Sequence, residues 1–535
     1  MAKGYLAIVL HAHLPFVRHP EHDGFLEENW LFEAITETYI PLLLALDTLE
    51  EQGTDFRLTL SITPTLASML NDQLLQSRYL RRLEKLIELG DKECRRTRPE
   101  PAFSRLARMY HKRLIEVRAA FLDRYDRDLI KAFRRLQDTG KIEIIASAAT
   151  HGYLPLLALN GSAVSAQVRL GIDNYRHMFG RRPDGFWLPE CGFYPGLDII
   201  LKELGIRFII LETHGVTHAR PRPKHGIHAP LYCPSGLAVF GRDPESSKQV
   251  WSSTEGYPGD HDYREFYRDI AYDLDLDYIR PYIHRDGIRI DTGFKYFRIT
   301  GKTDNKEVYI HEAARKKAEI HAGNFVFNRS QKIGLLSKNM DRKPLVVAPY
   351  DAELFGHWWH EGPLWLENVI RKICLGQKSV RMITLSEYLE EYPVNQLSVP
   401  SASSWGHEGF HNVWLNGSND WIYPHLHRGA VIMEDLARRF RDANGLKQRA
   451  LKQAARELLL AQASDWAFML NRGVMTEYAE TRVRTHLHRL LRLKEEIERG
   501  KIDEGRLSEI EGQDNIFPGI DPQAFLPVTD STLKA

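Results

Sequence analysis

Short apolar segments alternate with longer segments of helical periodicity along the first 400 or so residues of the chain. An uninterrupted apolar run is typical of a parallel strand that is covered on both faces, whereas apolar residues at helical spacing indicate an amphipathic helix. We expect strands at 4–10, 56–62, 141–147, 186–188, 207–211, 239–240, 344–349 and 380–385. We expect helices between them at 30–52, 162–179, 197–204, 263–271 and 307–336. This alternation predicts an α/β fold built on a parallel sheet.

Two long segments depart from the alternation. Residues 64–140 are almost entirely helical in pattern, with Leu75, Tyr79 and Leu83 at helical spacing, and we interpret them as an insertion over the mouth of a barrel. Residues from about 216 to 343 are irregular and rich in Pro, Gly, Tyr and His. Long loops inside a compact domain are usually functional, so we expect this region to lie near a site.

A Ser- and Pro-rich stretch at 398–404 marks a boundary. Beyond it the pattern is helical to about residue 500, and it is most clearly amphipathic at 430–440, 445–465 and 477–499. A chain of 535 residues is too long for one ordinary core. We therefore expect a barrel domain at 1–400 and an all-α C-terminal domain at 401–535 that contributes to the substrate groove.

Four of the expected strands end in polar, ring-rich corners. These corners contain His11 and His13, His151, Glu190, and His214. In a parallel barrel the carboxyl ends of the strands meet on one face, and that face carries the reactive groups. The repetition predicts a barrel with a single functional face.

Two carboxylates stand at the tips of different strands. Glu190 follows the strand that ends in Trp187, and Asp351 follows the strand at 344–349. Glu190 alone is equally well explained as a cap of the next helix. Together, flanked by aromatic rings and histidines, the two carboxylates make a glycosidase-like pair. Three further carboxylates compete for these roles: Glu212, Glu353 and Glu361.

The His-x-His pair at 11–13 allows two interpretations. Alternate residues on extended chain point the same way, so both rings are able to reach one pocket. They would serve as metal ligands if a third ligand were close, but none is evident nearby in the sequence. Hydrogen bonding to substrate hydroxyls is the interpretation we prefer, and two satisfied histidines at a strand end remain the structural alternative.

The amino-acid composition limits the classes of binding partner that we expect. Lys and Arg total 72 against 71 for Asp and Glu, so nothing in the charge favours nucleic acid, and a neutral substrate fits better. We expect no membrane partner, because no run is long enough to span a bilayer, and the run at 5–10 is too short for an export signal. The four cysteines are scattered, which predicts reduced thiols and a cytoplasmic location.

Five blocks of the sequence, in this order, make the chain recognisable. They are HAHLP at 11–15, EIIASAATHGYLP at 143–155, WLPECG at 187–192, PYDAELFGHWW at 349–359, and the Gly-rich segment that carries Trp405 and Trp414. On these blocks the chain resembles glycoside hydrolase family 57 over essentially its whole length, and within that family the 1,4-α-glucan branching enzymes. The resemblance implies a (β/α)7 barrel, a distorted relative of the eight-stranded barrel, followed by a helical domain.

The resemblance also implies a retaining glycosyltransferase that cleaves an α-1,4 glucan such as amylose and transfers the chain to a 6-hydroxyl, forming branches in a glycogen-type glucan. Glu190 falls at the family's nucleophile position and Asp351 at its acid/base position. Neither a metal nor an organic cofactor is required for that chemistry.

Further residues follow as candidate substrate contacts. His13, His151 and Trp359 fall in the matching blocks, and Tyr232 lies where branching enzymes of the family carry a loop tyrosine. Trp251 is a loop aromatic that we place over the site, although such rings more often only pack. For Trp405 and Trp414 we favour a surface that offers indole faces to a sugar chain, and a domain-packing cluster is the alternative.

Other functions remain open. An α-amylase or a 4-α-glucanotransferase of the same family would pass the glycosyl group to water or to a 4-hydroxyl. A metal-dependent polysaccharide deacetylase on a similar barrel would make His11 and His13 ligands. A catalytically idle glucan-binding protein is disfavoured because both expected carboxylates are present.

Overall fold

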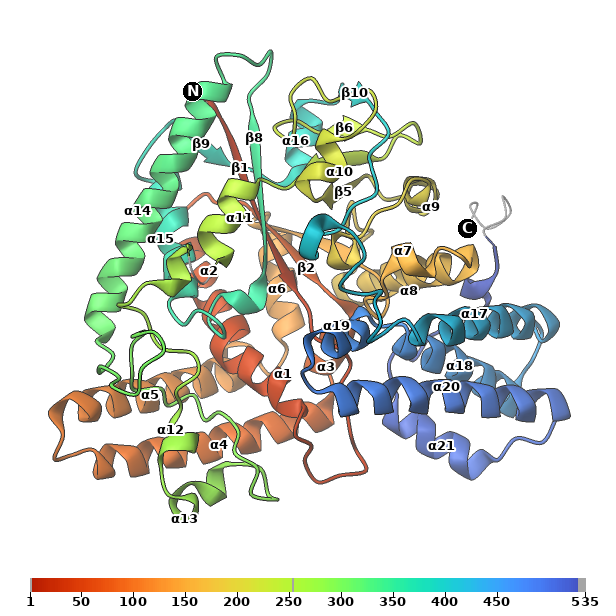
Figure 1. Ribbon diagram of the computed structural model, residues 1–535, viewed down its shortest axis with the longest axis horizontal. Helices are drawn as coiled ribbons and strands as arrows, with labels where there is room; N and C mark the ends of the chain where they lie inside the picture. Colours follow the sequence, from red (N-terminus) through yellow and green to blue (C-terminus); the bar gives the residue numbers. More distant parts are fainter. Residues whose placement is uncertain (1, 253–254, 528–535) are drawn as a thin grey trace.

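Seven parallel strands form the centre of the computed structural model, which describes residues 2–252 and 255–527 (Figure 1). Their spatial order is β8-β1-β2-β3-β4-β5-β7. The bounds are β1 (Gly4–Ala12), β2 (Leu58–Ile62), β3 (Ile142–Ser147), β4 (Gly185–Trp187), β5 (Phe208–Leu211), β7 (Ala238–Gly241) and β8 (Leu345–Asp351). A parallel bridge between Arg242 and Val347 joins the end of β7 to β8. The predicted (β/α)7 barrel is confirmed.

Three short strands complete the sheet. They are β6 (Leu231–Tyr232), β9 (Val380–Met382) and β10 (Gln396–Leu397). β6 runs antiparallel to β7 and parallel to β10, so this pair lies off the barrel proper. β9 pairs with the first residues of β1. Helix α16 (Leu385–Glu391) follows β9 and packs Tyr388 edge-on against Tyr5, which fills the barrel from the amino ends of its strands.

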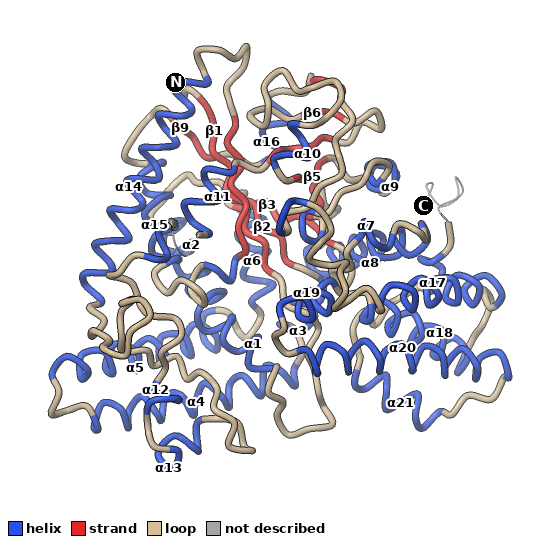
Figure 2. Tube along the Cα trace, in the orientation of Figure 1, coloured by secondary structure: helices blue, strands red, loops and turns tan. Residues whose placement is uncertain are grey.

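Helices surround the strands, as Figure 2 shows in blue around the red sheet. The helix predicted at 30–52 is continuous but contains one π-helical turn, Ile35–Tyr39. The long barrel helices are α1 (Glu28–Ala34), α2 (Ile40–Glu51), α8 (Gly161–Phe179), α9 (Leu197–Glu203), α14 (His311–Leu336) and α15 (Gly362–Cys374). The short ones are α7 (Leu154–Leu157), α10 (Thr213–Thr217), α11 (Pro244–Trp251), α12 (Ile270–Asp273) and α13 (Leu276–Ile279).

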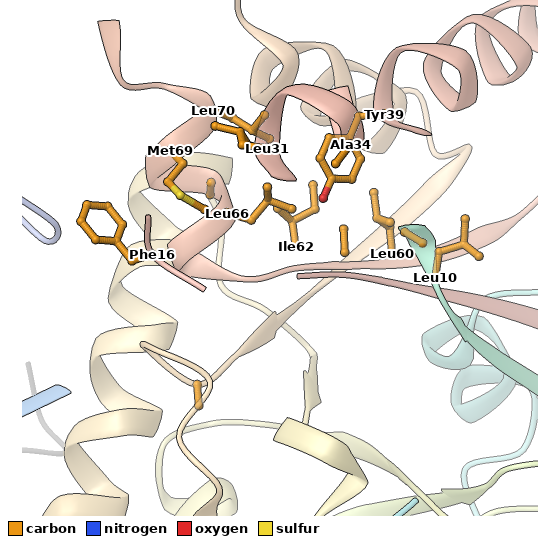
Figure 3. Close-up of a cluster of buried hydrophobic side chains, with 14 of the residues drawn as sticks. Leu10, Phe16, Leu31, Ala34, Tyr39, Leu60, Ile62, Leu66, Met69 and Leu70 are labelled. Atoms are coloured by element: carbon orange, nitrogen blue, oxygen red, sulfur yellow. The ribbon is translucent and has the colours of Figure 1, made fainter. Parts of the chain in front are cut away.

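The helical insertion is also confirmed. It consists of α3 (Pro64–Leu70), α4 (Gln73–Arg96), α5 (Pro101–Ala119) and α6 (Leu129–Asp138). Apolar side chains of α1 and α3 join those near the ends of β1 and β2 in one buried cluster, which includes Leu31 and Leu66 from the helices and Leu10, Leu60 and Ile62 from the strands (Figure 3). This packing fixes the carboxyl ends of the first two strands.

One predicted helix is wrong. Residues 263–269 are not helical: Arg264 forms an antiparallel bridge with Arg298, and Phe266 and Tyr267 lie in a loop. The helix begins only at Ile270, because the carboxylate of Asp269 accepts a hydrogen bond from the backbone N–H of Ala271 and caps α12 there.

The C-terminal part is helical, as predicted. Its helices are α17 (Ile422–Arg439), α18 (Gly445–Ala461), α19 (Ser464–Arg472), α20 (Thr476–Arg499) and α21 (Glu504–Gln513). The helix predicted at 445–465 breaks before Ser464, whose backbone N–H donates to the carbonyl of His151 at 3.1 Å. The helical domain therefore contacts the barrel at a strand end. No helix in the described part of the chain is long and apolar enough to cross a membrane.

Candidate active site

Glu190 sits in a strained turn directly after β4. Its backbone has φ 60° and ψ 23°, and Cys191 next to it has φ 50°. Side-chain-bearing residues adopt this left-handed region at an energetic cost, and such residues cluster at functional sites. His151, in the turn after β3, has φ 57°. Two neighbouring strand ends thus carry the same kind of strain.

Both carboxylate oxygens of Glu190 are held by hydrogen bonds. The indole N–H of Trp405 donates to Oε2 at 2.8 Å, and the hydroxyl of Ser464 donates to Oε1 at 3.0 Å. The backbone N–H of Trp405 also donates to the carbonyl of Glu190 at 3.0 Å. Nδ1 of His151 lies 3.9 Å from Oε1. This arrangement fixes the carboxylate in one orientation.

Asp351 ends β8, where it is paired in register with His11 of β1. Among the residues that the structure describes, no group forms a hydrogen bond to its carboxylate, so the carboxylate is available to a substrate oxygen. Burial raises the pKa of Asp351 well above its usual range, and the nearby charges of Glu353 and Glu190 add to the effect. Burial also raises the pKa of Glu190, although the hydrogen bond from Trp405 opposes the rise.

Three histidine rings stack beside the two carboxylates. The rings of His13 and His151 have centroids 3.8 Å apart, and Nε2 of His11 lies 3.1 Å from Nε2 of His151. Burial lowers the pKa values of His11 and His151 well below the usual range, so both rings are neutral. Burial alone would do the same to His13, but the charges of Asp465 and Glu190 outweigh it and raise its pKa.

Asp465 brings a carboxylate to this stack from the helical domain. Its Oδ1 lies 3.0 Å from Nε2 of His13. Ligand atoms of His13, His151 and Asp465 all lie within 4.8 Å of one another, a set that a metal ion is able to use. It is Asp465, and not His11, that joins His13 in this set. The His13–Asp465 hydrogen bond already satisfies both groups without an ion.

The three competing carboxylates each have a structural partner. Glu212 pairs with Arg242 at 2.8 Å. Glu353 accepts from the hydroxyl of Tyr39 at 2.5 Å. Glu361 accepts from the hydroxyl of Tyr309 at 2.6 Å. Of these five candidate carboxylates, Asp351 is thus the one whose side chain has no hydrogen-bond partner among the described residues.

Comparisons with known proteins identify the family of the chain. The family model for glycosyl hydrolase family 57 matches residues 7–331, and a model for the C-terminal domain of 1,4-alpha-glucan branching enzymes matches residues 425–525. The chain belongs to glycoside hydrolase family 57. It is 34% identical to the 1,4-alpha-glucan branching enzyme TK1436 of Thermococcus kodakarensis, over 96% of this chain and 77% of that protein.

Two crystal structures are similar to this chain along their whole length. The GH57-type branching enzyme of Pyrococcus horikoshii shares 34% identity and a TM-score of 0.88, covering 98% of this chain and 97% of the other. AmyC of Thermotoga maritima, described as a novel alpha-amylase, shares 42% identity and a TM-score of 0.92, covering 98% and 99%. Fold similarity therefore extends to proteins that are described by different reactions.

The structure separates the predicted aromatic contacts. Trp405 lies at the site, in contact with Glu190. Trp359 and Trp414 do not present their rings to solvent, since they are only 2% and 1% exposed. Trp414 stacks on Tyr153 with centroids 4.3 Å apart, which corresponds to the domain-packing alternative. We therefore revise our interpretation of Trp359 and Trp414 from sugar contacts to packing residues.

The two loop aromatics are not brought to the carboxylates. Tyr232 pairs with Ala238 at the amino end of β7, whereas Glu190 and Asp351 follow the carboxyl ends of their strands. Trp251 is half exposed at the last residue of α11, and the structure gives it no contact with Glu190 or Asp351 among the described residues. Tyr232 therefore lies at the end of the barrel opposite the two carboxylates, and no contact among the described residues links Trp251 to them.

Sequence reasoning missed Ser464 and Asp465. They stand at the end of the helix predicted at 445–465, where Ser464 contacts Glu190, 274 residues earlier in the chain, and Asp465 contacts His13. A Ser-Asp pair within a helical pattern is a signal for a helix start, because these residues favour N-terminal caps, and that signal would have found the break.

Proposed function

We propose that this protein is a retaining 1,4-α-glucan branching enzyme with Glu190 as nucleophile and Asp351 as acid/base. One observation carries the assignment of roles: both oxygens of Glu190 are held by hydrogen bonds, whereas the carboxylate of Asp351 has no partner among the described residues. A nucleophile needs an ionised, fixed carboxylate, and an acid/base needs a carboxyl that keeps its proton near neutral pH.

In the first half-reaction, an oxygen of Glu190 attacks the anomeric carbon of an α-1,4 linkage. As that bond forms, the bond between the anomeric carbon and the 4-oxygen breaks. Asp351 gives its proton to the departing 4-oxygen and becomes a carboxylate. The raised pKa of Asp351 favours the protonated form that this step requires. The product is a glycosyl ester on Glu190 and a shortened glucan with a new 4-hydroxyl.

In the second half-reaction, the 6-hydroxyl of an acceptor glucan attacks the same carbon. Asp351 now removes the proton of that hydroxyl, and the bond to Glu190 breaks. Glu190 leaves as a carboxylate, and hydrogen bonds from Trp405 and Ser464 stabilise the charge that returns to it. The raised pKa of His13 favours its protonated form, whose positive charge would act in the same direction. The enzyme recovers its starting protonation state.

Hydrolysis is the second candidate, because AmyC is described as an alpha-amylase. The two outcomes share the glycosyl-Glu190 intermediate and differ in whether water or a 6-hydroxyl reaches it first. Water at its bulk concentration of roughly 55 M competes with a positioned hydroxyl, whose effective molarity reaches about 10⁵ M or more. The branching enzymes among the relatives, and the match of residues 425–525 to the branching-enzyme C-terminal domain, favour transfer.

We also propose that the two domains have different roles. Residues 1–400 provide the barrel with both reacting carboxylates, and residues 401–535 provide groups that hold the nucleophile. The last residues, 528–535, lie outside the described part of the chain. The four free cysteines suit a protein that acts in the cytoplasm, and a glycogen-type glucan is the substrate we propose there.

One experiment tests the function. The enzyme is incubated with amylose, and new α-1,6 linkages are counted against new reducing ends. A branching enzyme should form branch points with few reducing ends, and Glu190→Gln should lose nearly all turnover while its melting temperature stays close to wild type. Reducing ends without branch points would make the protein an α-amylase. Near-normal turnover by a folded Glu190→Gln variant would refute the assignment of the nucleophile.

A further inference from the structure

A group of partly exposed aromatic rings lies on the turn that follows Asp351 and on the loop packed against that turn, and it has no role in the chemistry proposed above. Trp358 is 54% exposed although Trp359, next to it, is buried. The ring of Phe266 stacks on Trp358 with centroids 4.6 Å apart and an interplanar angle of 25°. Tyr267 is 82% exposed and stands edge-on to Phe266 at 5.0 Å. We call Phe266, Tyr267 and Trp358 the aromatic ledge.

The aromatic ledge is connected to β8, the strand that ends in Asp351. The turn that carries Trp358 begins directly after Asp351, and the backbone N–H of Trp358 donates to the carbonyl of Glu353 at 3.2 Å. Contacts with the π-helical turn Ile35–Tyr39 also hold this turn in place. The backbone N–H of His357 donates to the hydroxyl of Thr38 at 3.2 Å, and Gly356 packs against the carbonyl of Glu37 so tightly that any side chain would overlap it.

Polar groups adjoin the ledge. His357 contacts both Trp358 and Phe266 edge-on, with centroids 5.1 and 5.5 Å away, and it also lines a small cavity of about 30 Å³. The cavity is further lined by Glu33, Arg82 and Lys295, and Nε of Arg82 is buried with no hydrogen-bond partner among the described residues. A volume of this size holds about one water molecule or one hydroxyl group. The ledge therefore adjoins a polar residue, His357, that also borders a small cavity with polar walls.

This combination fits a sugar better than it fits a protein. Each aromatic side chain offers at most about 150–250 Å² of contact, whereas stable protein interfaces bury about 1,200–2,000 Å². One face of Trp358 is backed by Phe266, which leaves its exposed surface to receive a flat apolar partner. The apolar face of a pyranose ring is such a partner, and its hydroxyl edge matches the neighbouring donors and acceptors.

We propose that the aromatic ledge is a binding surface for a linear α-1,4-glucan chain. It holds a segment of the chain beyond the sugars that contact Glu190 and Asp351. The inference rests on the proposed function for the identity of the glucan. A ledge of this kind anchors long chains and leaves short oligosaccharides, which occupy only the sugars next to the catalytic pair, unaffected.

Binding to the full-length Glu190→Gln protein tests the proposal, because this variant should bind glucan without consuming it. Titration calorimetry compares a long linear α-1,4-glucan with maltotriose. Trp358→Ala and Tyr267→Ala should each weaken binding of the long glucan about tenfold, a size typical of an aromatic anchor. Trp358→Phe should recover most of the affinity. Maltotriose binding should be the same in all variants.

Phe327→Ala supplies the matched control, since Phe327 is an aromatic side chain on α14 that is 60% exposed and stacks with no other ring among the described residues. It should bind both glucans like the parent. Wild-type affinity of Trp358→Ala for the long glucan would overturn the proposal. So would an equal loss for the long glucan and maltotriose, because the ring would then serve the catalytic subsites or the fold. If the wild-type enzyme forms no α-1,6 linkages but the ledge variants lose long-chain affinity, the ledge stands and the branching function fails.

Discussion

Replacing Trp405 with phenylalanine isolates the hydrogen bond that the indole gives to the proposed nucleophile. Trp405→Phe keeps an aromatic ring in place but removes the N–H group that lies 2.8 Å from Oε2 of Glu190. Ser464 still donates to Oε1. The variant therefore removes one of two hydrogen bonds to the carboxylate and leaves most of the local packing.

The structure gives the direction and the size of the effect. Burial raises the pKa of Glu190, and the Trp405 hydrogen bond is the largest influence that opposes this rise. Loss of this hydrogen bond raises the pKa of Glu190 further, so the carboxylate becomes protonated at a higher pH. A hydrogen bond to a charged group contributes about 1.5–3 kcal/mol, and about 1.4 kcal/mol corresponds to a factor of ten. We expect the ionised fraction of Glu190 on the acid limb to fall about tenfold or more.

The measurement is the pH dependence of kcat/KM with a chromogenic maltooligosaccharide, because this parameter reports the ionisations of the free enzyme. The acid limb of Trp405→Phe should move to higher pH, with a smaller loss on the plateau. Trp414→Phe is the matched control: the indole N–H of Trp414 is buried without a hydrogen-bond partner among the described residues, so its removal should leave the limb in place. If the acid limbs of Trp405→Phe and the wild type coincide, the indole N–H does not tune Glu190 and our reasoning is refuted.

Three further predictions follow from the same contacts. Ser464→Ala should move the acid limb of kcat/KM to higher pH, as Trp405→Phe does, but by less. The reason is that the Ser464 hydrogen bond lowers the pKa of Glu190 less strongly than the Trp405 hydrogen bond does. An unchanged acid limb would mean that Ser464 only packs. Dialysis against a strong chelator should leave branching activity unchanged, because the His13–Asp465 hydrogen bond satisfies both groups; activity lost to the chelator and restored by zinc would indicate a metal at this cluster. Trp414→Ala should lower the free energy of unfolding by about 3–5 kcal/mol, as truncation of a buried tryptophan does. Branching and hydrolysis should fall in the same proportion. A selective loss of branching in a stable protein would instead make Trp414 an acceptor contact.

The barrel was predictable because each of its strands can be recognised from a short stretch of sequence. Each barrel strand is a short apolar run that ends in a breaker or a polar corner, and Glu190 and Asp351 follow such runs directly. The parallel topology then brings their carboxyl ends to one face without any knowledge of the contacts. The two reacting carboxylates could therefore be proposed from the sequence together with the family resemblance.

Other features depend on contacts that no local pattern contains. Trp358 and Trp359 are neighbours, and which of them is buried depends on how the turn is held against Glu37 and Thr38 of another helix. Tyr232 belongs to a two-residue strand that is completed by residues 396–397, so its place at the amino end of the barrel is set far along the chain. The sequence shows the rings but not their surroundings.

The nucleophile links the two domains thermodynamically. Glu190 belongs to the barrel, but the side chains that donate to its two oxygens, Trp405 and Ser464, both lie beyond residue 400. The negative charge of a buried carboxylate is costly unless such donors are present, and each contributes about 1.5–3 kcal/mol to a charged acceptor. Docking of the helical domain therefore favours ionisation of Glu190, and by the same linkage an ionised Glu190 favours docking. In the proposed mechanism this charge disappears when the glycosyl ester forms and returns when an acceptor takes the sugar, so the hydrogen bonds from the helical domain are strongest in the free enzyme and at product formation. By stabilising the departing carboxylate, these hydrogen bonds favour the second half-reaction with either acceptor, water or a 6-hydroxyl, and they oppose the first half-reaction by the same amount.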